Sequence, residues 1–287
     1  MKLVIFGLGF TAQAFVRFAQ DQFSAITATV RTNEKARQLS RPGLDVRVFS
    51  DTTIDPAIHP ALREADAVLI SAGPDEQGDA VLRHFSDEIT SSPTIHWIGY
   101  LSTIGVYGDT GGAWIDESEL PRPSHERTRI RVSVENEWLT LGQNAQKPVQ
   151  IFRLGGIYGP GRNPIRNLDQ RAQRVIKPGQ VFNRIHVDGI AQTLIASMAK
   201  PRAGAIYNVT DDEPAPPQDV LTFAAAMTGR EPPPEVPFEK AVMSEMARSF
   251  YADNKRVSNR LIREELGIDL KYPTYREGLR ALAATDM

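Results

Sequence analysis

The chain has 287 residues, of which 41% are hydrophobic and 24% charged, and its formal net charge is -2. A chain of this length buries a substantial core, either as one large domain or as a nucleotide-binding domain with a smaller one. The near-neutral charge excludes an overall basic field for nucleic-acid binding, and the absence of cysteine excludes disulfides, thiolate nucleophiles and zinc–thiolate sites.

The first apolar run, residues 2–6, ends at Gly7. A run this short is neither a secretory signal nor a membrane span, and no other segment approaches the length of a span. We therefore expect no membrane association. Together with the absence of cysteine, this favours a cytoplasmic protein.

Strand and helix patterns alternate along the chain. Strands are predicted at 2–6, 25–30, 45–48, 66–73, 94–101, 149–154 and 205–209, and helices at 11–19, 58–64, 79–90, 127–141 and 187–199. This alternation predicts an α/β fold with a doubly wound parallel sheet. Residues 1–155 are predicted to form a dinucleotide-binding domain, to which later elements at about 180–209 return. Residues 156–287, in which prolines interrupt regular structure, are predicted to form mostly a smaller substrate-binding lobe.

A glycine-rich turn, Gly7-Leu8-Gly9-Phe10-Thr11-Ala12, follows the first predicted strand. Gly7 permits a tight turn, Gly9 lets backbone N–H groups approach a pyrophosphate, and Ala12 allows close packing of helix and strand. The same spacing occurs in strand-to-helix turns of other α/β proteins, but its place after the first strand favours a Rossmann fold. We predict cofactor contacts from Gly7, Gly9, Phe10, Thr11 and Ala12, with phosphates at the helix N-terminus.

The end of the second predicted strand indicates which dinucleotide is bound. An acidic residue there typically binds the ribose 2′-hydroxyl of NAD, whereas this chain has Arg31 and Thr32. The planar guanidinium of Arg31 suits a 2′-phosphate. A solvated arginine is the alternative interpretation, and Glu34 is an outside candidate for a ribose contact. We predict NADP(H) rather than NAD(H), with Arg31 and Thr32 in the binding site.

Four later segments resemble a known family. Residues 100–109, Tyr-Leu-Ser-Thr-Ile-Gly-Val-Tyr-Gly-Asp, are similar to the Ser-Ser/Thr-x-x-Val-Tyr-Gly stretch of the extended short-chain dehydrogenases/reductases, the NAD-dependent epimerase/dehydratase family. Residues 153–161 resemble that family's Arg-x-x-Asn-x-Tyr-Gly-Pro-Gly, and residues 185–191 and 207–209 match later landmarks. The resemblance covers nearly the whole chain. Further predicted cofactor contacts are Ser71, Ala72, Gly73 and Ser102.

The chain departs from this family in its long predicted helix. The family has Tyr-x-x-x-Lys there, in which the tyrosine exchanges a proton and the lysine lowers its pKa and holds the nicotinamide ribose. Aligned through Glu135, the chain has Arg127 at the tyrosine position and Arg131 at the lysine position. Arginine stays protonated, so Arg127 is no general acid or base, whereas Arg131 still offers a positive donor to the ribose. The resemblance therefore implies an atypical member of the family.

Two residues are candidates for the chemistry. Thr103 matches the family's hydroxyl that binds the reacting carbonyl or alcohol, although a β-branched residue that merely ends a strand fits equally well. Tyr107 is the most natural substitute proton donor, or it lines the pocket as a tyrosine does elsewhere in the family. Arginines are dense in this half of the chain, which suits an anionic substrate, and some of them belong to solvated helix faces. The predicted substrate contacts are Arg127, Arg153, Tyr158 and Arg162, and no metal site is predicted.

Two functions of different class follow. The first is an NADP(H)-dependent oxidoreductase or epimerase/dehydratase that acts on a small polar or anionic, nucleotide-sugar-like substrate. The second is a protein that binds NADP(H) without turnover and reports the redox state to a partner. A catalyst that uses the same cleft without nicotinamide chemistry is a third possibility. The sequence leaves open whether the chain is a monomer or a homodimer.

Overall fold

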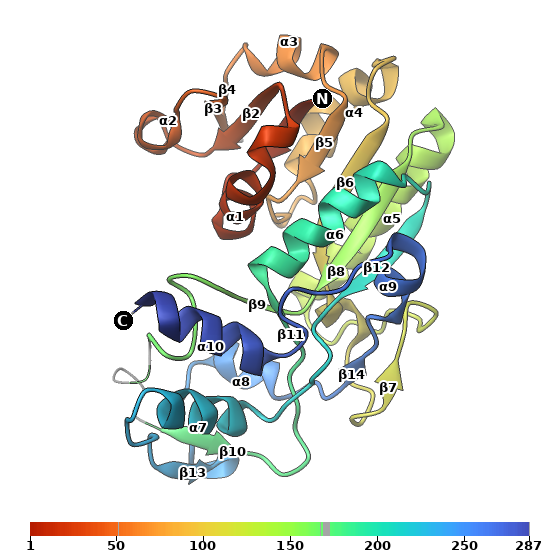
Figure 1. Cartoon of the computed structure of the whole chain (residues 1–287). Coiled ribbons are helices and arrows are strands. Elements are labelled where there is room, and N and C mark those ends of the chain that lie inside the picture. Colours follow the sequence, from red (N-terminus) through yellow and green to blue (C-terminus); the bar gives the residue numbers. More distant parts are fainter. Residues whose placement is uncertain (51, 167, 169–172, 287) are drawn as a thin grey trace. The chain divides into compact units, whose positions relative to one another are not determined.

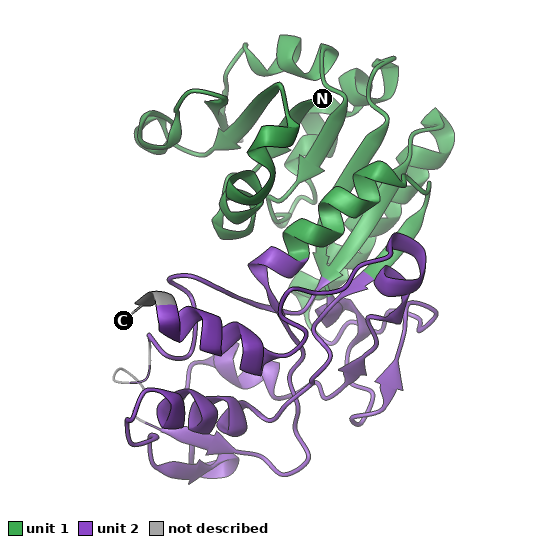
Figure 2. Cartoon of the chain, viewed as in Figure 1, with its two compact units in different colours: residues 1–103, 125–153, 190–207 green, residues 104–124, 154–189, 208–287 purple. Residues whose placement is uncertain are grey.

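The computed structural model describes residues 1–50, 52–166, 168 and 173–286 (Figure 1). The chain forms two compact units, each assembled from three separate segments (Figure 2). Unit 1 consists of Met1–Thr103, His125–Arg153 and Ile190–Tyr207, and unit 2 consists of Ile104–Ser124, Leu154–Gly189 and Asn208–Met287. The segment 104–124 therefore lies in unit 2, although it precedes two further segments of unit 1.

An eight-stranded sheet carries the fold of unit 1. Its strands are β1 (Lys2–Phe6), β2 (Ala25–Val30), β3 (Leu44–Ser50), β4 (Thr53–Ile54), β5 (Ala67–Ile70), β6 (Trp97–Thr103), β8 (Val149–Leu154) and β12 (Ala205–Val209). They lie in the order β12-β8-β6-β5-β1-β2-β3-β4. β1 pairs in parallel with both β2 and β5, whereas β4 pairs antiparallel with β3. The strand order reverses at β1, which confirms the predicted doubly wound α/β sheet.

Helices accompany the strands of this sheet (Figure 1). They are α1 (Phe10–Ala19), α2 (Asn33–Leu39), α3 (Ile58–Arg63), α4 (Ala80–Ser91), α5 (Glu126–Ala145) and α6 (Val187–Ala199), with a short 3-10 turn, η1 (Gln20–Gln22). The central strands are mostly apolar because both faces of the sheet are covered, and every residue of β5 and of β8 is buried. One core cluster includes Phe6, Phe85 and Trp138, and the rings of Phe6 and Phe85 are 5.2 Å apart.

Unit 2 is built from short elements. Among its described residues, the strands form three parallel pairs: β7 (Trp114–Ile115) with β14 (Arg256–Val257), β9 (Gly156–Tyr158) with β11 (Arg184–His186), and β10 (Arg174–Ile176) with β13 (Glu235–Pro237). Its helices are η2 (Ile104–Tyr107), α7 (Pro217–Met227), η4 (Phe238–Lys240), α8 (Glu245–Phe250), α9 (Arg260–Leu266) and α10 (Tyr275–Asp286). α7 and α10 share a core cluster that includes Ala224, Tyr275 and Leu279.

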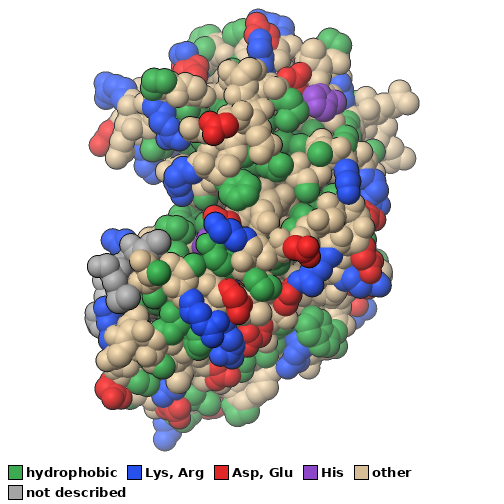
Figure 3. Space-filling view, viewed as in Figure 1, with side chains coloured by type: hydrophobic (Ala, Val, Ile, Leu, Met, Phe, Trp, Pro, Cys, Tyr) green, Lys and Arg blue, Asp and Glu red, His purple; other side chains and the backbone are tan. Residues whose placement is uncertain are grey.

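The surface carries charges of both signs. On the face shown in Figure 3, basic and acidic side chains are interspersed over both units. Among the described residues, we find no helix with the length and apolar character needed to cross a membrane.

Candidate functional site

The turn after β1 has a backbone that only glycine fits. Gly7 has a φ of +92°, and a Cβ added to it would lie 2.7 Å from the backbone nitrogen of Ala72. Its N–H donates to the hydroxyl of Thr29 at 3.0 Å, and the N–H of Leu8 donates to the Thr29 carbonyl at 2.7 Å. The turn is therefore anchored to β2 and packed against the loop that follows β5.

The N-terminus of α1 follows this turn directly. Gly9 is the N-cap residue, and α1, which is described throughout, has neither a side-chain cap nor an acidic residue in its first turn. A Cβ on Gly9 would meet no atom of the described residues within 4 Å. Thr11 and Ala12 are buried, which allows the helix to lie close to the sheet. Backbone N–H groups and open space at a positive helix end fit a diphosphate group.

The loop after β5 runs alongside the end of β1. The N–H groups of Ser71 and Ala72 both donate to the carbonyl of Phe6, at 2.8 and 2.9 Å. Ser71, Ala72 and Gly73 thus lie beside the glycine-rich turn, as expected for the carboxyl ends of neighbouring parallel strands. The structure brings these two predicted groups of cofactor residues together.

Arg31 and Thr32 follow the last residue of β2, and both are exposed. The Thr32 hydroxyl caps α2, because it accepts a hydrogen bond from the N–H of Lys35 at 3.3 Å. Glu34, the outside candidate for ribose, is exposed in the first turn of the same helix. Since β2 pairs in parallel with β1, Arg31 lies at the same edge of the sheet as the glycine-rich turn.

Arg127 and Arg131 lie in the first turns of α5, four residues apart and hence on one face of the helix. Arg127 is exposed, whereas Arg131 is partly buried. The Arg131 Nη1 donates to the Leu101 carbonyl at 2.7 Å and to the Tyr100 hydroxyl at 3.2 Å. Burial raises the pKa of Tyr100 above its usual range, so this hydroxyl stays protonated near neutral pH.

A buried ion pair lies further along α5. The Arg153 Nη2 is 2.7 Å from Oε2 of Glu135, and the two side chains are only 4% and 2% exposed. The Ser102 hydroxyl donates to the other oxygen of the same carboxylate. Ser102 and Arg153, predicted to contact cofactor and substrate, are thus joined through Glu135. In the sequence, Glu135 served only to align the long helix with that of the family, and its contacts with Ser102 and Arg153 were not predicted.

A second buried carboxyl of unit 1 went unrecognised in the sequence. Asp79 precedes α4, and its Oδ1 accepts hydrogen bonds from the N–H groups of Val81 and Leu82 at 2.7 and 3.2 Å. Burial raises the pKa of Asp79, an effect opposed by these hydrogen bonds and by the charge of Arg131. The N-cap position of an aspartate before an apolar helix was the available sequence signal.

The two catalytic candidates belong to different units. Thr103 is the partly buried last residue of β6, in unit 1. Tyr107 ends η2 in unit 2, is fully buried, and donates its hydroxyl proton to Oδ1 of Asn208 at 2.7 Å. The N–H of Asn208 in turn donates to Glu117 at 2.8 Å. The Tyr107 hydroxyl is therefore part of a hydrogen-bonded interior of unit 2.

Tyr158 and Arg162, the other two predicted substrate contacts, also lie in unit 2. Tyr158 is 6% exposed, its ring packs edge-on against His186 at 5.2 Å, and its hydroxyl donates to the Thr274 carbonyl at 3.4 Å. Arg162 is exposed and forms a backbone bridge with Gly159. The predicted substrate contacts thus divide between the units, with Arg127 and Arg153 in unit 1.

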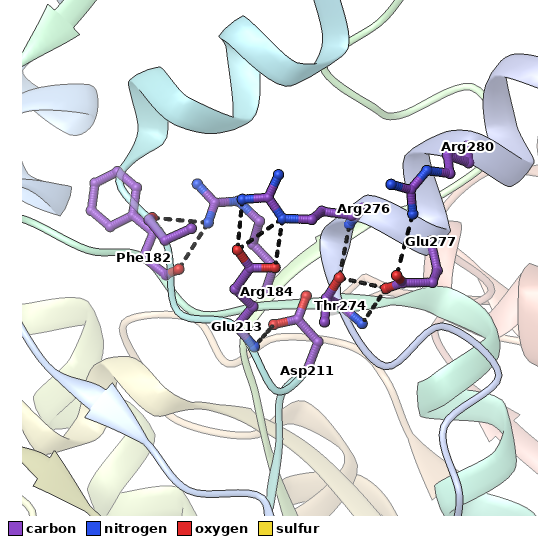
Figure 4. Close-up of polar contacts among 9 residues, drawn as sticks. Phe182, Arg184, Asp211, Glu213, Thr274, Arg276, Glu277 and Arg280 are labelled. Atoms are coloured by element: carbon purple, nitrogen blue, oxygen red, sulfur yellow. Dashed lines mark hydrogen bonds and ion pairs between the residues drawn. The ribbon is translucent and has the colours of Figure 1, made fainter. Parts of the chain in front are cut away.

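Unit 2 also contains a charged cluster that the sequence did not reveal (Figure 4). Arg276 pairs with Glu213 through two nitrogens, at 2.9 to 3.1 Å. Arg184 instead donates to the carbonyls of Phe182 and Ala215, at 2.8 and 3.1 Å. Burial raises the pKa of nearby Asp211 well above its ordinary value and lowers that of Arg184. No group of metal-binding side chains occurs among the described residues.

Comparison with known proteins identifies relatives along the full length. No family model matches the chain. A functionally unknown conserved protein from Silicibacter pomeroyi DSS is 45% identical, with 99% of each chain covered and a TM-score of 0.90. Protein YeeZ of Escherichia coli K12 is 26% identical over 285 residues, which cover 95% of this chain and 96% of the relative.

A third comparison concerns the fold alone. The UDP-glucuronic acid 4-epimerase of Bacillus cereus, solved with UDP-glucuronic acid and NAD, is 16% identical, with 99% and 98% of the chains covered and a TM-score of 0.77. The fold implied by the sequence resemblance is thereby confirmed. The chain has the fold of the extended short-chain dehydrogenases/reductases of the epimerase/dehydratase type, and it belongs to one family with the conserved protein of Silicibacter pomeroyi.

Proposed function

We propose that the chain binds a nicotinamide dinucleotide at the carboxyl ends of β1, β2 and β5. The observation that carries this proposal is the turn from Gly7 into α1, where a glycine at positive φ leads into a helix N-terminus that has no side-chain cap, a position that suits a diphosphate. Gly7, Gly9, Phe10, Thr11 and Ala12 would hold the diphosphate, with Ser71, Ala72 and Gly73 beside them. The Bacillus cereus epimerase, which has the same fold, was solved in complex with NAD.

NADP(H) is the preferred form in this proposal. Arg31 directly follows β2, at the place where an acidic residue would bind the ribose of NAD. Its guanidinium would pair with a 2′-phosphate, and the side chain is exposed. Thr32 contributes from the same turn while its hydroxyl caps α2.

The proposed activity is that of an oxidoreductase or an epimerase/dehydratase. The bound nicotinamide supplies a hydride donor or acceptor. Thr103 would hold the reacting carbonyl or alcohol, and Tyr107 or water would provide the proton, since Arg127 remains charged and exchanges none. Arg127, in the first turn of α5, favours a small polar or anionic substrate of the nucleotide-sugar class; the Bacillus cereus epimerase was solved with UDP-glucuronic acid.

Calorimetric titration of the protein with NADPH and NADH tests the cofactor. We expect NADPH to bind at least about tenfold more tightly, a difference of about 1.4 kcal/mol. A clear preference for NADH would contradict the role of Arg31, and the absence of binding by either nucleotide would contradict the whole proposal.

A second function, NADP(H) binding without turnover, is favoured by Arg127 and Arg131 of α5, which replace the family's tyrosine and lysine, and by the Tyr107 hydroxyl, which is bound to Asn208. The two functions separate in a screen of carbonyl compounds and sugar nucleotides that follows NADPH fluorescence. An epimerase or dehydratase returns the hydride to its substrate and leaves no net change in the cofactor, so the products of each mixture are also separated by chromatography. Net oxidation of NADPH, or conversion of a substrate without it, supports an enzyme, whereas tight binding with neither supports a sensor. If a detected activity survives in Tyr107→Phe, Tyr107 is not the proton donor.

A further inference from the structure

Arg131 joins three segments of unit 1. From α5, its Nη1 reaches the Leu101 carbonyl and the Tyr100 hydroxyl near the end of β6, at 2.7 and 3.2 Å. Its Nη2 lies 3.0 Å from the place that a Cβ would take on Gly73, in the loop after β5. The guanidinium therefore occupies the room that Gly73 leaves by having no side chain.

The surroundings of Arg131 hold the guanidinium in this place. The guanidinium carbon is 5.8 Å from the centre of the Tyr100 ring, and the buried carboxyl of Asp79 attracts the positive charge. Asp79 is itself fixed, because it caps α4 through Val81 and Leu82 and accepts a hydrogen bond from Trp138 at 3.4 Å. The same loop that contains Gly73 leads into Asp79, so Arg131 interacts with both ends of it.

The order of the strands relates this cluster to the proposed cofactor site. β2, which precedes Arg31, lies on one side of β1, and β5 and β6 lie on the other. A dinucleotide with its 2′-phosphate at Arg31 and its diphosphate at α1 extends its nicotinamide half toward the ends of β5 and β6. Arg131 lies where those two ends meet.

We propose that Arg131 is a positioning residue, which holds the loop of Ser71–Gly73 against the end of β6 and thereby shapes the wall that receives the nicotinamide half. This inference rests on the proposed function. A direct hydrogen bond to the cofactor needs only a positive donor, which lysine also supplies. A positioning role needs the planar fork, because one group must reach Leu101, Tyr100 and the space beside Gly73 together.

The variants Arg131→Lys and Arg131→Met test this difference. Each is titrated with NADPH and with adenosine 2′,5′-bisphosphate, which has the 2′-phosphate but no nicotinamide. We expect both variants to bind NADPH about tenfold more weakly, a size typical of coupling between linked sites, and to bind the bisphosphate as the wild type does. Wild-type NADPH affinity in Arg131→Lys would overturn the proposal.

Arg129 provides the matched control. It lies on the same helix, its side chain is 55% exposed, and it pairs with Glu126 at 2.8 Å. Arg129→Lys and Arg129→Met therefore repeat the chemical change without touching β6 or Gly73, and they should bind both nucleotides as the wild type does. If the wild type binds neither nucleotide, the proposed function fails; if it binds both and the Arg131 variants match it, only the positioning role fails.

Gly73→Ala tests the same contact without removing the charge, and it carries the test if Arg131→Met does not fold. Gly73 has no positive φ, so alanine adds a methyl group without backbone strain. The methyl group displaces Nη2, and we expect weaker NADPH binding with unchanged binding of the bisphosphate. In the double variant with Arg131→Lys the two losses should be less than additive, because both disturb one contact. Full NADPH affinity in Gly73→Ala, or strict additivity of the losses, would contradict the inference.

Discussion

The two units treat buried polar groups differently. Six buried side-chain atoms have no hydrogen-bond partner within the part of the chain that the structure describes: Nε2 of Gln150 in unit 1, and Oε1 of Gln180, Nδ2 of Asn208, Oδ2 of Asp211, Oε1 of Gln218 and the hydroxyl of Tyr275 in unit 2. An unsatisfied buried polar atom costs about 1–3 kcal/mol. Among the described residues, unit 1 thus leaves one such atom without a partner and unit 2 leaves five, which gives unit 2 a polar interior suited to water or a polar ligand.

The largest expected effect concerns the buried network of unit 1 in which the carboxylate of Glu135 binds Arg153 and Ser102. In Glu135→Gln the charge of Arg153 loses its counter-ion in a site where both side chains are almost fully buried. We expect the free energy of unfolding to fall by about 3 kcal/mol, as measured by urea denaturation. The control is Glu137→Gln on the same helix, where the exposed carboxylate accepts a hydrogen bond from Ser133 at 2.9 Å. Equal stability of the two variants would show that the network does not hold unit 1 together.

The second prediction concerns the glycine-rich turn of unit 1. Gly7→Ala introduces an unfavourable φ and a contact of 2.7 Å with the backbone of Ala72. The φ alone costs about 1–2 kcal/mol, so we expect a larger loss of stability and loss of NADPH binding. Gly43→Ala is the control, because Gly43 has a φ of +80° with no atom near its Cβ position. A loss in Gly7→Ala no larger than that in Gly43→Ala, with NADPH still bound, would remove the turn from the proposed site.

The third prediction concerns the recognition of the 2′-phosphate by Arg31 in unit 1. Arg31→Ala should weaken NADPH binding about tenfold and leave NADH binding unchanged, because only NADPH has the 2′-phosphate. Titration calorimetry measures both affinities. Arg37→Ala, at the other end of α2, removes another exposed arginine and should change neither affinity. An equal loss for both nucleotides in Arg31→Ala would mean that the residue does not recognise the phosphate.

The smallest expected effect lies in unit 2. Burial raises the pKa of Asp211 well above its ordinary value, so the folded state holds a proton that the unfolded state releases. This contribution to stability is fully present below the unfolded pKa of about 4 and is lost as the pH rises through the folded pKa. Urea denaturation between about pH 4 and pH 7 should therefore reveal a decline in the wild type that Asp211→Asn lacks.

The neighbouring residue provides the control for this pH dependence. Asp212 accepts hydrogen bonds from Arg263 and, at 2.7 Å, from Asn259, and it is partly exposed. Asp212→Asn should keep the decline of the wild type. A decline of the same size in Asp211→Asn would show that another group is responsible.

The two units also differ in how far the sequence predicts them. The strands of unit 1 follow from long apolar runs, and the turn at Gly7 and the place of Arg31 follow from spacing after those runs. The partners of Arg131 were not predictable, because Leu101 and Gly73 come from other segments and one contact is with a main-chain carbonyl. The same holds for the ion pair of Arg153 with Glu135, which needs the packing of α5 on the sheet.

Unit 2 was predictable only in outline. Its strands have two or three residues, too few for a periodic pattern, and β7 pairs with β14 although they are far apart in the sequence. The placement of Tyr107 in unit 2, where its hydroxyl binds Asn208, depends on such long-range packing. The proline-rich composition indicated irregular structure but not its contacts.

A crystal structure of the protein grown with NADPH tests the central claim most directly. The proposed site predicts the diphosphate at the N-terminus of α1, within hydrogen-bonding distance of the backbone N–H groups that follow Gly9, and the 2′-phosphate against Arg31. A nucleotide bound elsewhere on the protein, or no bound nucleotide at saturating concentration, would contradict the claim.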